Sequence, residues 1–217
     1  MAPLQKKSDV ISLQKDTLKL KGKAVPTLVK VMKSADYPDK SRWVATFLLG
    51  KIMGKKSSPY ISKYLDHPNW VMRLAGLKTL LALKEVGFNK GYEKALSDNS
   101  LLVRSQALDN IVKLNIQKSA PSVWAMLYDK KNYHQSKELK KKKRTHLIKK
   151  VVRAVGDLKF EKAKAPLLSM IQKKKYEDIF NEMDYSLARI LGKKSPKGSM
   201  KKKRMFWSKV GLSQKTI

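Results

Sequence analysis

Hydrophobic side chains recur along this chain at helical spacing, and the whole pattern repeats at a fixed step. Leu49, Leu80 and Ile111 lie 31 residues apart, each within a helix-like run of apolar positions. Three arginines keep the same step: Arg42, Arg73 and Arg104. A repeat of about 20–50 residues is typical of stacked arrays, in which each unit buries its apolar face against its neighbours. The pattern therefore predicts a chain built from similar helical units.

Each unit is expected to contain two helices. The longer, first helices are predicted, after a weaker helix at 9–20, at 40–53, 69–84, 100–115, 139–158 and 178–192. Several second helices start with a proline, which suits a first helical turn because an N–H there has no intrahelical partner. These prolines are Pro26, Pro59, Pro121 and Pro166. Because no window alternates polar and apolar residues as a strand does, the fold class is expected to be all-α.

The fourth unit interrupts the repeat. Arg144 follows Arg104 by 40 residues instead of 31, so about nine residues are inserted, within about 129–144. Insertions in such arrays lie in loops on one face, often the binding face. We therefore divide the chain into a repeat array over 1–192 and a basic tail over 193–217. Much of the tail is expected to be flexible without a partner, because it carries many lysines and no acidic residue; the apolar cluster Met205-Phe206-Trp207 is the exception and is expected to dock back.

Two junctions between units carry a motif known from a repeat family. Residues 65–73 read LDHPNWVMR and residues 96–104 read LSDNSLLVR, and apolar residues follow the second copy at fixed offsets: Ala107, Leu108, Ile111 and Leu114. These segments resemble the junctions of HEAT-like repeats, although Thr46 and Gly76 depart from the family's leucine and alanine. The resemblance implies a right-handed α-solenoid of about five antiparallel helix pairs over roughly 23–192. Such arrays serve mostly as binding scaffolds.

Net charge is the unusual property of the composition. Forty-nine Lys and Arg residues against seventeen Asp and Glu residues give a formal charge of +32. Phosphate-rich polymers are natural partners of so basic a chain, because neutralising phosphates releases their counterions. Nucleic acid, duplex DNA before RNA, is therefore the expected partner of a non-enzymatic, monomeric binding protein. An acidic protein, an anionic polysaccharide and an anionic membrane surface are the alternatives.

Two groups of residues are predicted to contact nucleic acid. The first is the densest cationic stretch of the repeat array: Lys140, Lys141, Lys142, Lys143, Arg144, Lys149, Lys150 and Arg153. The alternative interpretation, a solvated helix face, normally comes with interspersed glutamates, and here only Glu138 is near. The second group lies in the tail: Lys201, Lys202, Lys203 and Arg204, with Phe206 and Trp207 as rings that stack on bases. A localisation signal and an aromatic anchor for the last repeat are the alternatives for the tail.

The repeated arginines allow two interpretations. Together with Arg144 they form a ladder that contacts phosphates, or each pairs with an aspartate of its own or the next junction and joins neighbouring units. Such pairs would be Asp66 with Arg73 or Asp98 with Arg104. In HEAT-like families these pairs join the units, so the second interpretation is preferred for Arg42, Arg73 and Arg104.

A second resemblance concerns enzymes. One HEAT-like family comprises DNA glycosylases for alkylated purines, which use aromatic residues, an arginine and a catalytic aspartate in a concave cleft. The matching residues would be Trp70, Arg73 and Asp109, but no segment reproduces that family's catalytic motif. The chain is therefore expected not to be an enzyme. The tryptophans of the repeat helices are interpreted as packing residues: Trp43, Trp70 and Trp124.

Other chemistry lacks its residues. The chain has no cysteine and three widely spaced histidines, so neither a metal site nor a cofactor is expected. The acidic cluster, Glu177, Asp178, Glu182 and Asp184, is interpreted as favouring a helix N-terminus. No apolar run reaches the roughly 18 residues of a membrane span. The cytoplasm with its nucleoid, or the nucleus, is the favoured compartment, and an exported mature form stays open.

Overall fold

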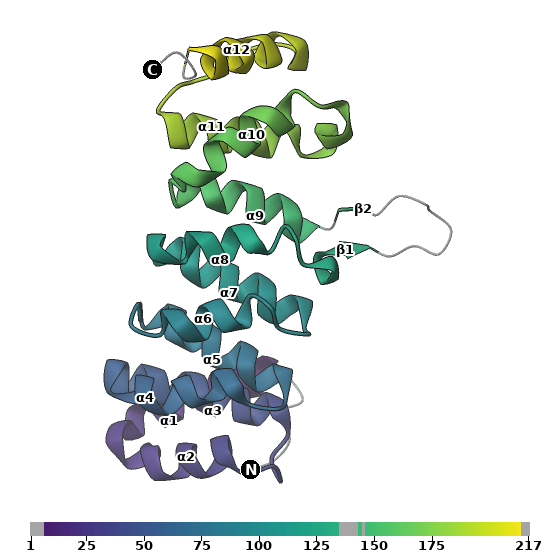
Figure 1. The fold of residues 1–217 in the computed structure, drawn as a ribbon. Helices are drawn as coiled ribbons and strands as arrows, with labels where there is room; N and C mark the ends of the chain where they lie inside the picture. Colours follow the sequence, from purple (N-terminus) through teal and green to yellow (C-terminus); the bar gives the residue numbers. More distant parts are fainter. Residues whose placement is uncertain (1–6, 135–142, 145, 214–217) are drawn as a thin grey trace. The chain divides into compact units, whose positions relative to one another are not determined.

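The computed structural model of the chain describes residues 7–134, 143–144 and 146–213. It divides into two compact units, Met1–Leu114 (unit 1) and Asn115–Ile217 (unit 2). Both units are built of helices that pack against their neighbours, which confirms the all-α prediction (Figure 1). Each helix in the described part of the chain is too short or too polar to span a bilayer.

Unit 1 consists of short helices separated by 3₁₀ turns. Its elements are α1 (Lys7–Leu20), η1 (Lys21–Ala24), α2 (Val25–Lys33), α3 (Asp39–Met53), η2 (Gly54–Ser57), α4 (Ser58–Ser62), η3 (Lys63–Asp66), α5 (Trp70–Ala82), α6 (Asn89–Ala95) and α7 (Leu101–Lys113). Helix α3 packs against α2 and α5, and α5 packs in turn against α7. The helices predicted at 40–53, 69–84 and 100–115 are therefore confirmed as α3, α5 and α7.

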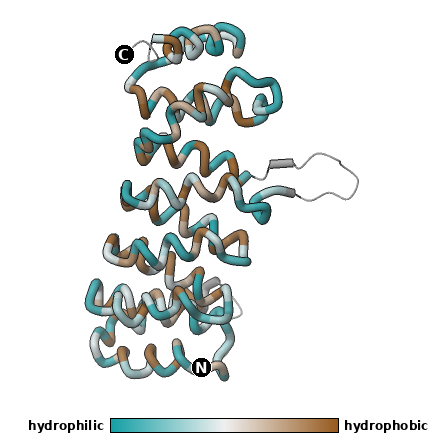
Figure 2. Tube along the Cα trace, in the orientation of Figure 1, coloured by the Kyte–Doolittle hydropathy of each residue, from teal (hydrophilic) through white to brown (hydrophobic). Residues whose placement is uncertain are grey.

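The repeated apolar positions form the core of unit 1. Leu49, Leu80 and Ile111, which mark the 31-residue step, are all completely buried. Figure 2 shows how brown apolar positions alternate with teal polar positions along each helix. The repeat in the sequence is thus a repeat of buried contacts, since each of these side chains occupies the same place in its own helix.

The first helices end at a residue with positive φ. Six described residues with positive φ follow the ends of such helices by one or two positions. Four are not glycine: Lys21 (48°), Lys84 (54°), Asn115 (51°) and Lys159 (50°). The other two are Gly54 (57°) and Gly192 (64°). A left-handed residue ends a helix because it turns the chain away from the axis. Glycine fits this conformation without a steric cost, whereas an L-residue other than asparagine or aspartate rarely adopts it.

Unit 2 contains the insertion and the tail. Its elements are η4 (Gln117–Ser119), α8 (Ala120–Ala125), η5 (Lys130–Asn132), β1 (Tyr133–His134), β2 (Lys143–Arg144), α9 (His146–Asp157), η6 (Glu161–Ala163), α10 (Lys164–Ile171), η7 (Lys174–Ile179), α11 (Phe180–Leu191) and α12 (Met200–Leu212). Helices α9 and α11 approach closely at Gly156, where an added Cβ would lie 2.6 Å from the Cα of Ser186. The Ser186 hydroxyl donates to the Val152 carbonyl at 2.5 Å in the same contact.

Two expectations for this unit are wrong in part. The helix predicted over 139–158 begins only at His146, because Lys143 and Arg144 are extended and pair with His134 and Tyr133 in an antiparallel register. Five consecutive cations disfavour a helix, since like charges four residues apart repel, while the apolar stripe that drives helix formation starts at Leu147. Residues 139–142 and 145 lie outside the described residues.

The second expectation that is wrong in part concerns the tail. Residues 200–212 form helix α12 instead of a flexible chain, and Ser199 caps its N-terminus by accepting from the Lys202 N–H at 3.4 Å. Trp207 and Val210 of α12 are buried, and the helix packs against α10. The two buried apolar side chains explain the difference, because they stabilise a docked helix that the charge composition alone disfavours.

Candidate nucleic-acid interface

The first predicted cationic group is only partly within the described structure. Lys140, Lys141 and Lys142 lie outside the described residues, and Lys143 and Arg144 form strand β2. The other three residues of the group lie on α9: Lys149, Lys150 and Arg153. Lys149 and Lys150 are half-buried and Arg153 is exposed. The opposite face of α9 is apolar and buried, so the helix orients its cations toward solvent.

Arg153 extends this surface onto the neighbouring helix α11. Its guanidinium lies 4.0 Å from the centre of the Tyr185 ring, and the guanidinium of Arg189 lies 5.7 Å from the same ring. Arginine stacks favourably on an aromatic face, so the ring holds both cations in place. Neither Tyr185 nor Arg189 was expected at the site, although their i, i+4 spacing on one helix is a usable signal.

Asp157 is the acidic group of this surface, and it is engaged internally. The Tyr185 hydroxyl donates to Asp157 Oδ1 at 2.5 Å, and Arg189 Nε lies 3.2 Å from the same oxygen. The hydrogen bond to Asp157, followed by burial, raises the pKa of Tyr185 above its ordinary value. The carboxylate therefore orders the ring and the arginine, and its charge is largely cancelled within the protein.

The predicted tail cations divide into two pairs. Lys201 and Lys202 are exposed on α12. Lys203 Nζ instead lies 2.6 Å from Asp184 Oδ2 on α11, with the lysine side chain 23% exposed. Arg204 donates to the Ile171 carbonyl at 3.0 Å and lies 3.4 Å from Glu177 Oε1. Lys203 and Arg204 thus hold α12 onto its neighbours, which leaves Lys201 and Lys202 as the outward cations of the group.

Trp207 cannot stack on a base in this structure. Its side chain is completely buried, and its indole Nε1–H donates to Asp184 Oδ1 at 2.7 Å. Phe206 meets Trp207 edge to face, with ring centres 4.8 Å apart. The alternative interpretation of these rings, an aromatic anchor that docks the last helix, is therefore the one that the contacts favour.

Asp184 is the residue on which this docking depends. Its burial would raise the pKa of the carboxyl group, but hydrogen bonds from Lys203, Ser195 and Trp207 outweigh burial and hold the pKa below its ordinary value. The interpretation of the acidic cluster as favourable to a helix N-terminus therefore missed the role of Asp184. Its position on the buried face of α11 was the available signal, since a buried carboxylate needs partners.

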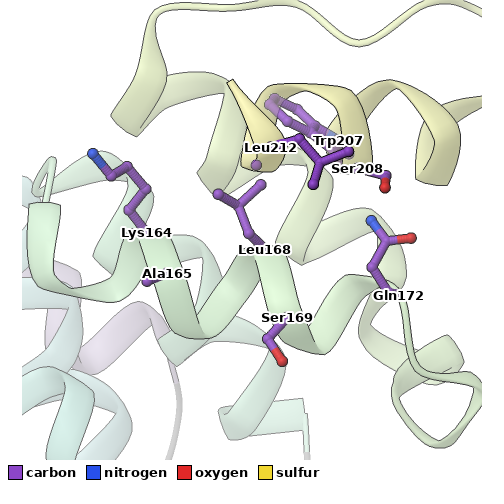
Figure 3. Close-up of a pocket in the computed structure, with 9 residues that line it drawn as sticks. Lys164, Ala165, Leu168, Ser169, Gln172, Trp207, Ser208 and Leu212 are labelled. Carbon is purple, nitrogen blue, oxygen red and sulfur yellow. The ribbon is translucent and has the colours of Figure 1, made fainter. Parts of the chain in front are cut away.

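A groove separates α10 from α12 beside the buried tryptophan (Figure 3). Its volume is about 450 Å³, and its lining combines apolar and polar side chains. Leu168 and Leu212 approach one another across it, while Lys164 and Gln172 extend from α10 on either side of Leu168. The groove is open and contains one cation, so it adds little to a phosphate-binding surface.

The repeated arginines of unit 1 join neighbouring junctions. Arg73 Nε and Nη2 donate to Asp98 Oδ2 and Oδ1 at 2.6 and 2.8 Å, a bidentate contact that draws the pKa of Asp98 below its ordinary value despite the opposing effect of burial. Arg73 Nη1 also donates to the carbonyls five and six residues earlier, and Arg104 Nη1 repeats this at the next junction. The interpretation that these arginines pair with junction aspartates is confirmed for Arg73, whose partner is Asp98 of the next junction. Asp66 instead pairs with Lys94 at 2.7 Å.

Of the three residues named for a glycosylase, Arg73 lines a described cavity of unit 1, and neither Trp70 nor Asp109 lines that cavity. Arg73 lines a cavity of about 440 Å³ formed by residues 65–68 and 94–99, and its guanidinium is bound to Asp98 there. Trp70 is 42% exposed on α5, and Asp109 is half-buried on α7. Among the described residues, no cluster of three or more histidine or acidic side chains is placed to hold a metal ion.

No protein-family model matches the sequence, and no curated protein is significantly similar to it. The fold and the site define an all-helical protein whose helices pack against their neighbours and whose solvent-facing charge is predominantly cationic.

Proposed function

We propose that this protein binds the phosphate backbone of nucleic acid, duplex DNA in particular, without catalysis. The supporting observation is that acidic residues form ion pairs with lysines and arginines of the protein itself. Six carboxylates are neutralised by cations of their own unit, in the pairs Asp39–Arg42, Asp66–Lys94, Asp98–Arg73, Asp157–Arg189, Asp184–Lys203 and Glu177–Arg204. Because these pairs consume equal numbers of each sign, the net charge of +32 remains on the other side chains.

The fold we propose for this activity is a right-handed α-solenoid of about five HEAT-like helix pairs. Its support is the recurrence of one junction geometry at Arg73 and Arg104, 31 residues apart, together with a left-handed residue after each of α5 and α7. Such an array displays one side chain per unit at regular intervals, which suits a regular polyanion.

The main contact surface would be the α9 surface, defined as Lys149, Lys150 and Arg153, with Lys140 to Arg144 preceding it in the sequence. Lysine-rich surfaces contact phosphates as point charges and carry no base readout, so the binding is expected to depend little on sequence. Lys201 and Lys202 would add contacts from α12.

A titration of fluorescence anisotropy against labelled duplex DNA, single-stranded DNA and RNA, at about 50 to 300 mM salt, tests this function. Tight duplex binding that weakens steeply but persists near physiological salt supports it. Equal binding to all three polymers that vanishes by about 150 mM would show that the charge is only adhesive. Saturable binding to one acidic protein with weak, length-independent DNA binding would favour the scaffold alternative.

The site is tested by reversing Lys141, Lys142 and Lys143 to glutamate together. The matched control in unit 2 reverses Lys162, Lys173 and Lys174, which are exposed lysines outside the α9 surface. Both variants lower the formal charge equally, so a site is indicated only when the first variant weakens binding more than the control and lowers the salt slope by about two to three.

A further inference from the structure

Unit 1 has two edges that differ in charge. One edge carries the turns that join the helices of each pair, at residues 20–24, 53–57 and 83–88. Five lysines on these turns are all exposed: Lys21, Lys23, Lys55, Lys56 and Lys84. We call these five residues the lysine edge. Its turns contain one acidic residue, Glu85, whose Oε1 accepts from the Ser58 hydroxyl at 3.0 Å.

The three turns lie together along this edge. The Ser58 hydroxyl, which directly follows the second turn, donates to Glu85 in the third turn, and η1, which carries Lys21 and Lys23, packs against α3, the helix that precedes the second turn. Figure 1 shows unit 1 as a stack in which α3, its turn and α4 lie next to α1 and α2. The three turns of the lysine edge therefore belong to neighbouring elements of unit 1 that pack against one another.

The opposite edge is formed by the junctions between pairs, and three carboxylates hold cations there. Asp39, Asp66 and Asp98 lie there, and each is paired with a cation. The Asn69 side chain also donates to Asp39 Oδ2 at 2.7 Å, which links two successive junctions. The carboxylates of the junction edge are thus engaged in ion pairs within unit 1. By contrast, no ion pair involves the five lysines within the described residues.

Helix stability does not account for the lysine edge. Cations near the C-terminus of a helix complement its dipole, but Lys23, Lys55 and Lys56 lie beyond the ends of α1 and α3, in 3₁₀ turns. Lys21 and Lys84 have φ values of 48° and 54°, where glycine or asparagine is the favoured residue. The backbone at these positions therefore disfavours lysine, and the charge itself is the common property of the five residues.

We propose that the lysine edge of unit 1 is a second contact site for a nucleic-acid phosphate backbone, separate from the α9 surface of unit 2. The inference rests on the proposed function and adds the place where unit 1 takes part. Neighbouring packed helices lie about 8–10 Å apart, no farther than the Debye length of about 10 Å at 0.1 M salt. The fields of lysines on adjacent turns therefore add, and a polyanion that follows the edge is attracted to all of them at once.

A triple reversal with a matched control tests the lysine edge in the full-length chain. The edge variant is Lys55→Glu/Lys56→Glu/Lys84→Glu, and the control is Lys30→Glu/Lys33→Glu/Lys63→Glu, three exposed lysines of unit 1 away from the lysine edge. The two variants have the same net charge. The edge variant is expected to weaken duplex binding roughly tenfold or more and to lower the salt slope by about two to three, while the control changes Kd less than about threefold.

The outcomes separate this inference from the proposed function. If the wild-type chain does not bind nucleic acid, the proposed function fails first. If the wild type binds and the Lys141–Lys143 reversal weakens it, but the edge variant behaves like its control, only the lysine edge is refuted. Equal, large losses in both unit 1 variants would also refute it, because they would show an effect of net charge alone.

Two further measurements keep the test decisive. Circular dichroism checks folding, and the neutral variant Lys55→Gln/Lys56→Gln/Lys84→Asn replaces the reversal if that variant unfolds, since asparagine tolerates a positive φ. Leu20 and Val86 are exposed beside the edge, so vesicles containing an anionic lipid serve as a second probe. An edge variant that loses vesicle binding but retains wild-type DNA affinity would overturn the proposal in favour of a lipid surface.

Discussion

Arg42 Nη2 lies 3.1 Å from His67 Nε2. One repeat later, Arg73 corresponds to Arg42 and Asp98 corresponds to His67, and Arg73 Nη2 donates to Asp98 Oδ1. The backbone repeats the relationship too. The Asn69 N–H donates to His67 Nδ1 at 3.0 Å, and the Ser100 N–H donates to Asp98 Oδ1 at 2.8 Å. The imidazole of His67 therefore stands where the repeat geometry favours a carboxylate.

The replacement His67→Asp is expected to stabilise the protein. A carboxylate accepts from both donors, whereas a neutral imidazole has one acceptor nitrogen, so one donor at His67 is unsatisfied in either tautomer. We expect the free energy of unfolding in urea at pH 7 to rise by about 1–2 kcal/mol, even though the stacking of the ring on Tyr64 is lost. The gain should largely disappear when Arg42 is replaced by methionine, and an unchanged or lower stability of His67→Asp itself would contradict the interpretation.

The same site predicts a pH dependence. Burial, then the charge of Arg42, lowers the pKa of His67 below its ordinary value, with Asp39 and Arg73 as the other charged groups facing it. The unfolded chain therefore binds a proton at higher pH than the folded chain, so stability falls as the pH drops below about 6.5 and levels off below the folded pKa. Urea titrations between pH 7.5 and 4.5 should show this loss in the wild type and a clearly smaller one in His67→Asp.

Removing one partner of the Arg73–Asp98 pair is expected to be costly. The two side chains are 16% and 9% exposed, so Asp98→Ala leaves a largely buried guanidinium without its carboxylate. The expected loss is about 2–4 kcal/mol in the free energy of unfolding. The matched control is Asp66→Ala, which breaks an exposed pair with Lys94 and should cost less than about 1 kcal/mol. Similar losses for both variants would show that burial of the pair is unimportant.

Asp184→Ala is expected to release α12. Both Lys203 and Trp207 lose their acceptor, and a buried indole N–H without a partner costs about 1–3 kcal/mol. Hydrogen exchange in residues 200–212 and tryptic cleavage near Lys201 should both become faster, while exchange in unit 1 stays unchanged. Glu182→Ala on the same helix is the control, and equal exchange in the two variants would rule out Asp184 as the docking residue.

Lys84→Gly separates stability from binding. Because Lys84 has a φ of 54°, glycine relieves its conformational strain, and the free energy of unfolding should rise by up to about 1 kcal/mol. Affinity for duplex DNA should fall at the same time, since one cation of the lysine edge is removed. Lys113→Gly, at the last residue of helix α7, should instead lower the free energy of unfolding, by less than the about 1 kcal/mol that glycine costs in a helix interior. A Lys84→Gly variant that is both less stable and equally tight in binding would contradict both parts of the prediction.

Local sequence patterns were sufficient to predict the helices and the spacing of their buried positions. The spacing of Leu49, Leu80 and Ile111 and the prolines at 26, 59, 121 and 166 locate elements correctly, because helix periodicity and the first-turn preference of proline act within a few residues. Arg73 was also correctly expected to pair with an aspartate of its own or the next junction.

Which side chains contact one another depends on how the elements pack. The partner of Arg73 is Asp98 and not Asp66, Trp207 is buried against Asp184, and Lys143 and Arg144 leave the predicted helix for a strand pair. Each of these contacts joins residues that lie 9 to 25 positions apart in the chain, and local propensity contains no information about such contacts. Charge composition predicted a mobile tail, but the burial of one indole with its hydrogen bond to a carboxylate outweighs it in α12.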